Sequence, residues 1–174
     1  MILTAIQKRR SVRQFASREV PAELVEELIR AAQFAPSGMN NRAVEFVVLR
    51  GPEAKETLYG LLEPKQPFVR DAPVVILPVT DLAKIPLAGE DQQVVAVADI
   101  ALASSFIMTQ AVVLGLGTVW KHISRELAPA VAEAFGLPPT FTLFNAIPIG
   151  YPAEQPAPHY HDEFLAAKIH PGRW

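Results

Sequence analysis

Hydrophobic residues recur at helical spacing in several stretches of this 174-residue chain. The clearest stretch begins at Pro21, a residue suited to the first turn of a helix, and stops before Pro36, so we predict an amphipathic helix over 21–34. Its apolar face consists of Leu24, Val25, Leu28, Ile29 and Ala32. Shorter helices are predicted over 4–10, 52–62 and about 124–135.

Runs of β-branched and aromatic residues predict the strands. The run over 74–79 is apolar throughout, which is typical of a strand buried on both faces. Further strands are predicted over 44–50, 118–120 and 141–149. Prolines are frequent over 152–174, so we expect this stretch to run extended over a surface without adding a regular element.

A long helix is predicted from about 91 to 114, and it is apolar around nearly its whole circumference. In a chain of this size, such a helix indicates burial from several sides, a second subunit included. Residues 94–117 are also numerous enough to cross a bilayer, but polar side chains interrupt them and the paired aromatic and basic flanks are missing. A buried helix is therefore favoured over a membrane span. The interrupting residues are Asp99, Ser104, Ser105, Thr109 and Gln110.

Composition narrows the classes of function. Lysine and arginine number 16 against 18 acidic residues, a formal charge of −2, which offers no broad surface for nucleic acid or an anionic membrane. The chain has no cysteine, which excludes disulfides, iron–sulfur clusters and cysteine nucleophiles, so redox chemistry requires a bound cofactor. The apolar run over 1–6 is too short for a signal peptide, and we expect a single cytoplasmic domain.

Two short motifs carry candidate chemistry. Residues 9–13 hold three arginines and a serine, donors that match a phosphate group. Residues 35–42 concentrate turn-forming residues with short polar side chains. Taken singly, the first motif could be a solvated basic helix end and the second a helix stop followed by a tight turn. Their order and spacing favour a shared anion site.

The same residues resemble motifs of the nitroreductase family of FMN-dependent flavoproteins. The likeness continues nearly to the end of the chain, through 71–76, 114–120, 149–154 and 169–174. In the two N-terminal motifs it rests on Arg9, Arg10, Ser11, Arg13, Phe15, Ala35, Pro36, Ser37 and Asn40.

The resemblance implies an α+β fold with a mixed central sheet flanked by helices, as one domain over 1–174. It also implies a homodimer with two FMN molecules at its interface, each touched by both chains. The extended arm over 152–174 would embrace the partner subunit, with Trp174 as its anchor; a frayed tail is the alternative.

The resemblance also assigns roles to residues. Arg9, Arg10 and Ser11 would bind the FMN phosphate, and Arg13 would stabilise negative charge near N1 and the C2 carbonyl of the reduced ring. The opposite subunit would contribute Pro36, Ser37 and Asn40. A loop approaching the ring edge would contribute Lys65 and Gln66. The segment whose backbone lies along the ring, with one amide pointing at N5, is Thr118, Val119, Trp120, Lys121 and His122.

Three features depart from the usual family pattern. Arg42, Ala43 and Val44 stand where relatives often carry glutamine, proline and tryptophan, and many relatives have glycine near His122. Pro158 and His159 stand where relatives usually show lysine or arginine, so Arg173 is the first choice for the tail residue that closes the phosphate site. The other tail candidates are Lys168 and His159.

The predicted function is transfer of hydride from NADH or NADPH through flavin N5 to a nitroaromatic, a quinone or a similar acceptor by ping-pong kinetics. No side chain is predicted to act as an acid, base or nucleophile, because the cofactor performs the chemistry. The alternatives are a specialised flavin oxidase or dehydrogenase and a non-catalytic dimeric flavin-binding module.

Two further interpretations are weaker. A metal site in the tail could use His159, His161, His170 and Glu163, but the segment looks too irregular to preorganise ligands. A dinucleotide-binding interpretation of Gly115 and Gly117 is discarded, because these glycines end the predicted helix and do not open one.

Overall fold

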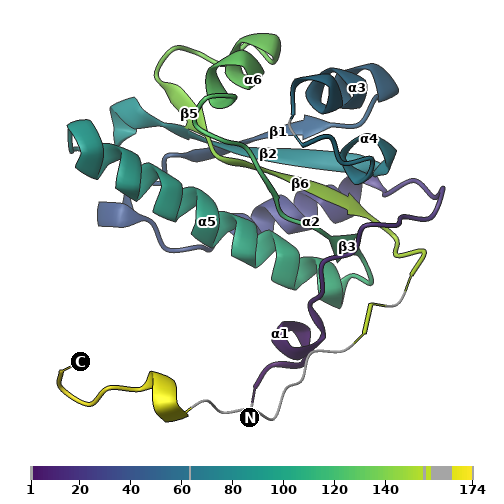
Figure 1. Ribbon diagram of the computed structural model, residues 1–174, viewed down its shortest axis with the longest axis horizontal. Coiled ribbons are helices and arrows are strands. Elements are labelled where there is room, and N and C mark those ends of the chain that lie inside the picture. The colour runs from purple at the N-terminus through teal and green to yellow at the C-terminus, as the bar shows by residue number, and fades with distance from the viewer. Residues whose placement is uncertain (1, 63, 155, 158–165, 174) are drawn as a thin grey trace.

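A β-sheet with helices on both faces forms the centre of the molecule (Figure 1). The computed structural model describes residues 2–62, 64–154, 156–157 and 166–173. The strands lie in the order β1 (Val44–Leu49), β2 (Val74–Asp81), β6 (Asn145–Gly150) and β3 (Gly117–Thr118). Two further strands extend this sheet: β4 (Lys121–His122) pairs with β6, and β5 (Phe141–Leu143) pairs with β2. All these pairings are antiparallel, while an isolated parallel bridge joins Ser11 to Thr118.

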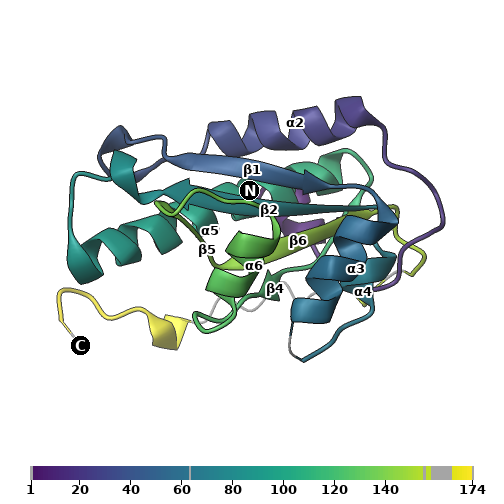
Figure 2. The ribbon, with the colours of Figure 1, turned by 90° about the horizontal axis from the view of Figure 1, so that it is seen from above.

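The alternation of side chains along β2 builds two separate cores. Val75, Leu77 and Val79 face a layer made by α3 (Pro52–Leu61), α4 (Phe68–Asp71) and α6 (Ala128–Ala134). Val74 and Ile76 face a layer made by α2 (Ala22–Gln33) and α5 (Gly89–Val113). Figure 1 shows the two layers above and below the sheet, and in Figure 2, seen from above, α3, α4 and α6 lie in front of it. The prediction that β2 is buried on both faces is confirmed.

Most predicted helices lie within two residues of their expected positions. They are α1 (Thr4–Lys8), α2, α3 and α5. The helix predicted over 124–135 begins only at Ala128, because Pro129 belongs to a first helical turn and residues 124–127 form a separate turn. Helix α4 and three short 3₁₀ helices were not predicted; the latter are η1 (Gly38–Asn40), η2 (Leu82–Lys84) and η3 (Ala166–Lys168).

The strand predicted over 141–149 is divided into β5 and β6. Leu143 lies opposite Val79 and Ile147 lies opposite Ile76, so β5–β6 carries one more residue than β2 over the same stretch. Such an extra residue is a β-bulge, which bends the strand. The predicted strand over 118–120 likewise stops at Thr118. Pro148, opposite Val119, has no N–H with which to complete the ladder.

Helix α5 packs against α2 and the sheet, as predicted for a core helix. By length and composition alone it could also cross a membrane. It ends at Val113, one residue before the predicted end, and Gly115 follows with a φ of 70°, which suits the residue after a helix cap. Several apolar side chains on the face of α5 that points away from the sheet are exposed to solvent. These side chains, the α5 stripe, are Val94, Leu102, Phe106 and Val113.

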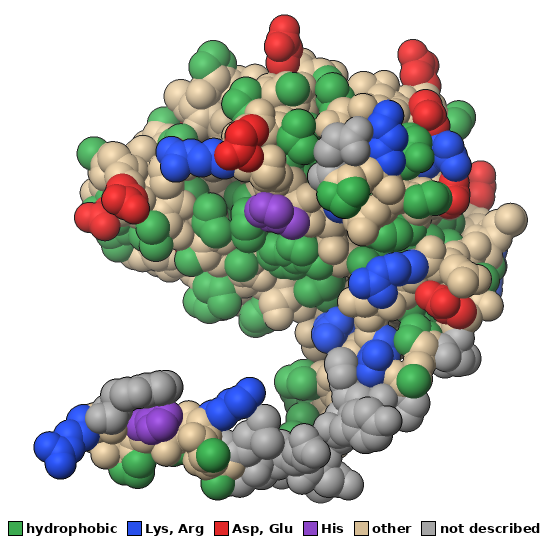
Figure 3. All heavy atoms as spheres, viewed as in Figure 1, with side chains coloured by type: hydrophobic (Ala, Val, Ile, Leu, Met, Phe, Trp, Pro, Cys, Tyr) green, Lys and Arg blue, Asp and Glu red, His purple; other side chains and the backbone are tan. Residues whose placement is uncertain are grey.

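The C-terminal arm leaves the body after β6. Its first residues are bonded to the N-terminal segment: Pro152 forms a β-bridge with Phe15, and Ala153 N–H donates to Gln14 O at 2.9 Å. Residues 166–173 are all exposed, and they include the 3₁₀ turn η3, which the sequence did not predict. Figure 3 shows them standing clear of the body across an open hollow.

Candidate functional site

The N-terminal segment lies directly against the edge of the sheet at β3. Val12 N–H donates to Thr118 O at 2.9 Å, and Ser11 forms the parallel bridge to the same residue. Gly117 makes this approach possible, because a Cβ there would lie 2.7 Å from the Cβ of Val12. The structure thus brings the segment predicted to bind phosphate, 9–13, next to the start of the segment predicted to contact the flavin ring, 118–122.

The backbone of the segment is also held beyond Ser11. The Glu154 carboxylate accepts the N–H groups of Arg13 at 2.9 Å and Gln14 at 3.3 Å. The Arg18 guanidinium stacks over the Tyr151 ring at 3.8 Å, a cation–π contact. Glu154 belongs to the motif 149–154, but no role was predicted for it from the sequence. Glu154 fixes the backbone of Arg13 while the Arg13 side chain remains exposed.

Amides of the edge strand alternate between the sheet and the open side. Val119 N–H donates to Pro148 O at 3.2 Å and Ile123 N–H to Phe144 O at 2.9 Å. Because successive amides of an extended strand point in opposite directions, those of Trp120 and His122 point away from β6. Among the described residues, no strand pairs with this edge beyond Thr118. A planar ligand lying along the edge would meet these amides.

Side chains of the same segment alternate between the two faces of the sheet. The bulged residue Phe144 packs edge-on against Trp120, with ring centroids 5.4 Å apart, and against His122, at 5.3 Å. Lys121 is only 5 % exposed, and its Nζ donates to Pro64 O at 3.0 Å. Lys121 therefore ties the loop that carries the predicted residues Lys65 and Gln66 to the strand.

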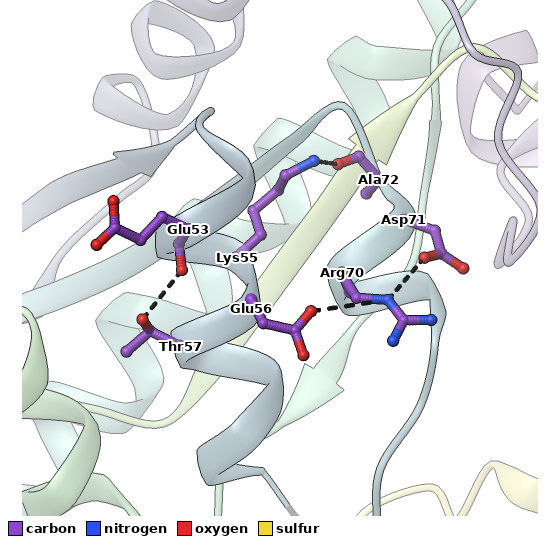
Figure 4. A network of polar contacts seen from close by, with 7 residues as sticks. All are labelled: Glu53, Lys55, Glu56, Thr57, Arg70, Asp71 and Ala72. Atoms are coloured by element: carbon purple, nitrogen blue, oxygen red, sulfur yellow. Dashed lines mark hydrogen bonds and ion pairs between the residues drawn. The ribbon is translucent and has the colours of Figure 1, made fainter.

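A network of polar side chains supports that loop from α3 and α4 (Figure 4). Arg70 Nε lies 3.1 Å from an Asp71 carboxylate oxygen and 3.9 Å from one of Glu56, and the hydrogen bond with Asp71 raises the pKa of Arg70. Lys55 Nζ donates to Ala72 O at 2.6 Å, and burial lowers the pKa of Lys55.

The Tyr59 ring links the network to the loop. The Arg70 guanidinium lies 4.8 Å from its centroid and Lys65 Nζ lies 5.7 Å from it. Both ion pairs of Arg70 are exposed, so the network orients the loop more than it stabilises the fold.

The second motif lies elsewhere. Residues 36–42 lead into β1, at the opposite edge of the sheet from β3 and β4, and Gly38 N–H donates to Asp99 of α5 at 2.8 Å. Two strands separate the edges, a distance of roughly 14 Å at the usual strand spacing. One chain therefore does not bring Pro36, Ser37 and Asn40 to the segment 118–122.

The predicted tail residues are also apart from this edge. Lys168 and Arg173 are exposed, and Figure 1 shows their segment, 166–173, away from β3. His159 and Trp174 lie outside the described residues, as do His161 and Glu163 of the alternative metal site. Those predictions stay untested.

A groove of about 960 Å³ opens on the side of His122 that faces α5 and α6. Its walls are largely apolar and come from the first half of α5, from α6 and from β5. The groove provides room for a partner element or a substrate next to the edge strand.

Comparison with known proteins decides the family. The family model described as "Nitroreductase family" matches residues 6–65 and 60–151, most of the chain. The chain belongs to the nitroreductase family. A relative from Methanothermobacter thermautotrophicus, with the provisional name NADH dehydrogenase/NAD(P)H nitroreductase, is 36 % identical over 177 residues, which cover 99 % of this chain and 87 % of that protein.

Solved structures agree with this family. An FMN-dependent nitroreductase from Clostridium difficile superposes with a TM-score of 0.85 at 26 % identity, and 98 % of each chain is covered. A provisionally named nitroreductase from Desulfovibrio desulfuricans, solved in complex with FMN, gives a TM-score of 0.82 at 27 % identity. The superposition covers 95 % of this chain and 92 % of the Desulfovibrio chain. The predicted family, the fold and, at the level of the family, an FMN-dependent NAD(P)H oxidoreductase are confirmed.

Proposed function

We propose that this nitroreductase moves hydride from NADH or NADPH through FMN to a nitroaromatic, a quinone or a similar oxidised acceptor. The observation that supports the proposal is the contact of Ser11 and Val12 with Thr118 of β3, two residues before Trp120 on the edge strand. When bound, FMN supplies the hydride-accepting atom N5 and the electrons for the acceptor. The chain supplies binding, orientation and charge.

The donors present fit FMN. Two guanidiniums and a hydroxyl, from Arg9, Arg10 and Ser11, supply the charge-assisted hydrogen bonds that a dianionic phosphate requires. The exposed guanidinium of Arg13 is available to stabilise negative charge on the ring. The outward amide of Trp120 or His122 would hydrogen-bond the ring along its edge. Lys65 and Gln66 would approach the same edge, since Lys121 holds the neighbouring Pro64.

Each site would be completed by a second copy of the chain. Pro36, Ser37 and Asn40 are held at the opposite sheet edge, so they can reach a flavin only in a partner subunit. The exposed α5 stripe offers an apolar surface for such a partner, and Figure 3 shows hydrophobic side chains gathered on the side of the body that faces the hollow. The arm would cross to the partner, where Arg173 would close the phosphate site.

Ping-pong kinetics follow from a single open face. The nicotinamide and the acceptor would occupy the same side of the ring in turn, so one must leave before the other binds. The cytoplasmic location inferred from the sequence is part of this proposal.

Initial-rate kinetics test the proposal. FMN-loaded protein is assayed with NADH and NADPH against menadione and nitrofurazone, with the same concentration of free FMN as control. We expect oxidation of the nicotinamide well above that control and parallel lines in double-reciprocal plots. Intersecting lines would contradict the ping-pong mechanism. Bound FMN without turnover would favour the non-catalytic module, and turnover of another substrate with oxygen alone would favour the specialised oxidase.

A further inference from the structure

The loop over 37–42 has an unusual backbone. Met39, Asn40 and Arg42 have φ angles of 54°, 53° and 49°. The left-handed region is unfavourable for residues that carry a Cβ, so three such residues in four positions require contacts that hold them there. Strained backbone of this kind is found where a loop must be held ready for a ligand.

Asp99 provides those contacts from α5. Its side chain is buried, with 2 % exposure, although the surrounding helix faces an apolar core. One carboxylate oxygen accepts Gly38 N–H at 2.8 Å and the other accepts Asn41 Nδ2 at 2.9 Å. Burying a carboxylate is unfavourable unless its oxygens are hydrogen-bonded, and each Asp99 oxygen accepts a hydrogen bond from this loop.

Asn41 connects Asp99 to the start of the sheet. Its Oδ1 accepts Ala43 N–H at 2.8 Å, immediately before β1 begins at Val44. A second bond closes the loop, since Ser37 Oγ accepts Arg42 N–H at 3.1 Å. Gly38 presses on α5 so closely that a Cβ there would lie 2.6 Å from a methyl group of Val95. Helix, loop and first strand are thereby joined through one buried carboxylate.

We propose that Asp99 is a positioning residue for flavin binding, which holds Ser37 and Asn40 in the conformation that the partner subunit's FMN requires before FMN arrives. The inference rests on the proposed function, because it assigns this loop to the partner's flavin. Asp99 does not touch the flavin in this account. Because Asp99 holds the loop in one conformation before FMN binds, the binding of FMN does not carry the entropy cost of ordering the loop.

The chain offers a matched pair of variants. In Asp99→Asn, Gly38 keeps its acceptor, but an introduced NH₂ group faces the NH₂ of Asn41, so two donors oppose each other. In the exchanged variant Asp99→Asn/Asn41→Asp, the introduced amide donates to the introduced carboxylate, and Ala43 N–H keeps an acceptor. The exchange restores every bond of the wild-type arrangement and serves as the folding control.

Two measurements separate positioning from simple stability. Flavin fluorescence gives the FMN dissociation constant, and mass spectrometry follows tryptic cleavage after Arg42, an exposed residue, in the protein without FMN. For D99N we expect at least a fivefold weaker FMN affinity and at least fivefold faster cleavage at Arg42. The exchanged variant should return both within about twofold of wild type.

Several outcomes would overturn the inference. Faster cleavage in D99N with wild-type FMN affinity would show that the loop is held by Asp99 but is not used for flavin, so Asp99 would be structural only. Unchanged cleavage, or failure of the exchange to restore FMN affinity in a folded protein, would show that the hydrogen bonds do not position the loop. If wild-type protein binds no FMN, the proposed function itself fails, whatever the cleavage rates.

Discussion

Two glycines determine whether the N-terminal segment can lie against the sheet. A Cβ at Gly117 would collide with Val12, and one at Gly150 would lie 2.8 Å from the Phe15 ring. Both glycines fall in motifs that mark the family, and the structure gives the physical reason: the backbone must approach closely. Ser11 and Val12 can lie against β3 only because of this fit.

Arg10 tests the role of that segment at the scale of one residue. Arg10→Ala should lower FMN affinity by about 1–3 kcal/mol, the usual range for losing a hydrogen bond to a charged group. Fluorescence titration measures the loss. Arg30→Ala is the matched control, because Arg30 is exposed on α2 and pairs only with Glu27 among the described residues. Equal affinities of the two variants would argue against a phosphate site at Arg10.

At the scale of elements, the long helices were predictable and the breaks in strands were not. Apolar spacing over several turns identifies α2, and the length of an almost continuous apolar run identifies α5, without knowledge of their neighbours. The bulge before β6 depends on register with β2, which no local pattern reveals. The role of Asp99 was hidden for the same reason, because its partner Gly38 is 61 residues away.

Glu154 links two elements and gives a prediction at their scale. Glu154→Ala removes the acceptor for Arg13 and Gln14 N–H, worth roughly 1 kcal/mol per bond before solvent screening. Hydrogen exchange at these two amides should become severalfold faster, whereas Glu154→Gln, which retains an acceptor oxygen, should preserve most of the protection. Unaltered exchange in Glu154→Ala would show that other contacts hold the segment.

The whole molecule looks incomplete as a single chain. The α5 stripe is exposed, residues 166–173 of the arm are exposed, and the two motifs proposed to bind flavin lie at opposite edges of the sheet. A second copy would cover the stripe, receive the arm and bring the motifs together. These three features are independent of one another, and each supports a dimer.

Removal of the arm tests the assembly. A chain that ends before His159 loses residues 159–174 and should dissociate at higher concentration than the full chain, because the arm would contribute contacts with the partner. Sedimentation equilibrium on both proteins measures the difference. A truncated protein with an unchanged dissociation constant would show that the arm is dispensable for assembly.

Mixed dimers test most directly the claim that each flavin site is built from two chains. One chain carries Arg9→Ala/Arg10→Ala and the other carries Asn40→Ala, with different affinity tags so that the mixed dimer can be isolated. FMN titration should find one site per mixed dimer with wild-type affinity, because one site combines both intact motifs. Each homodimer of a variant should have only weakened sites. A mixed dimer in which no site regains wild-type affinity would contradict the shared site.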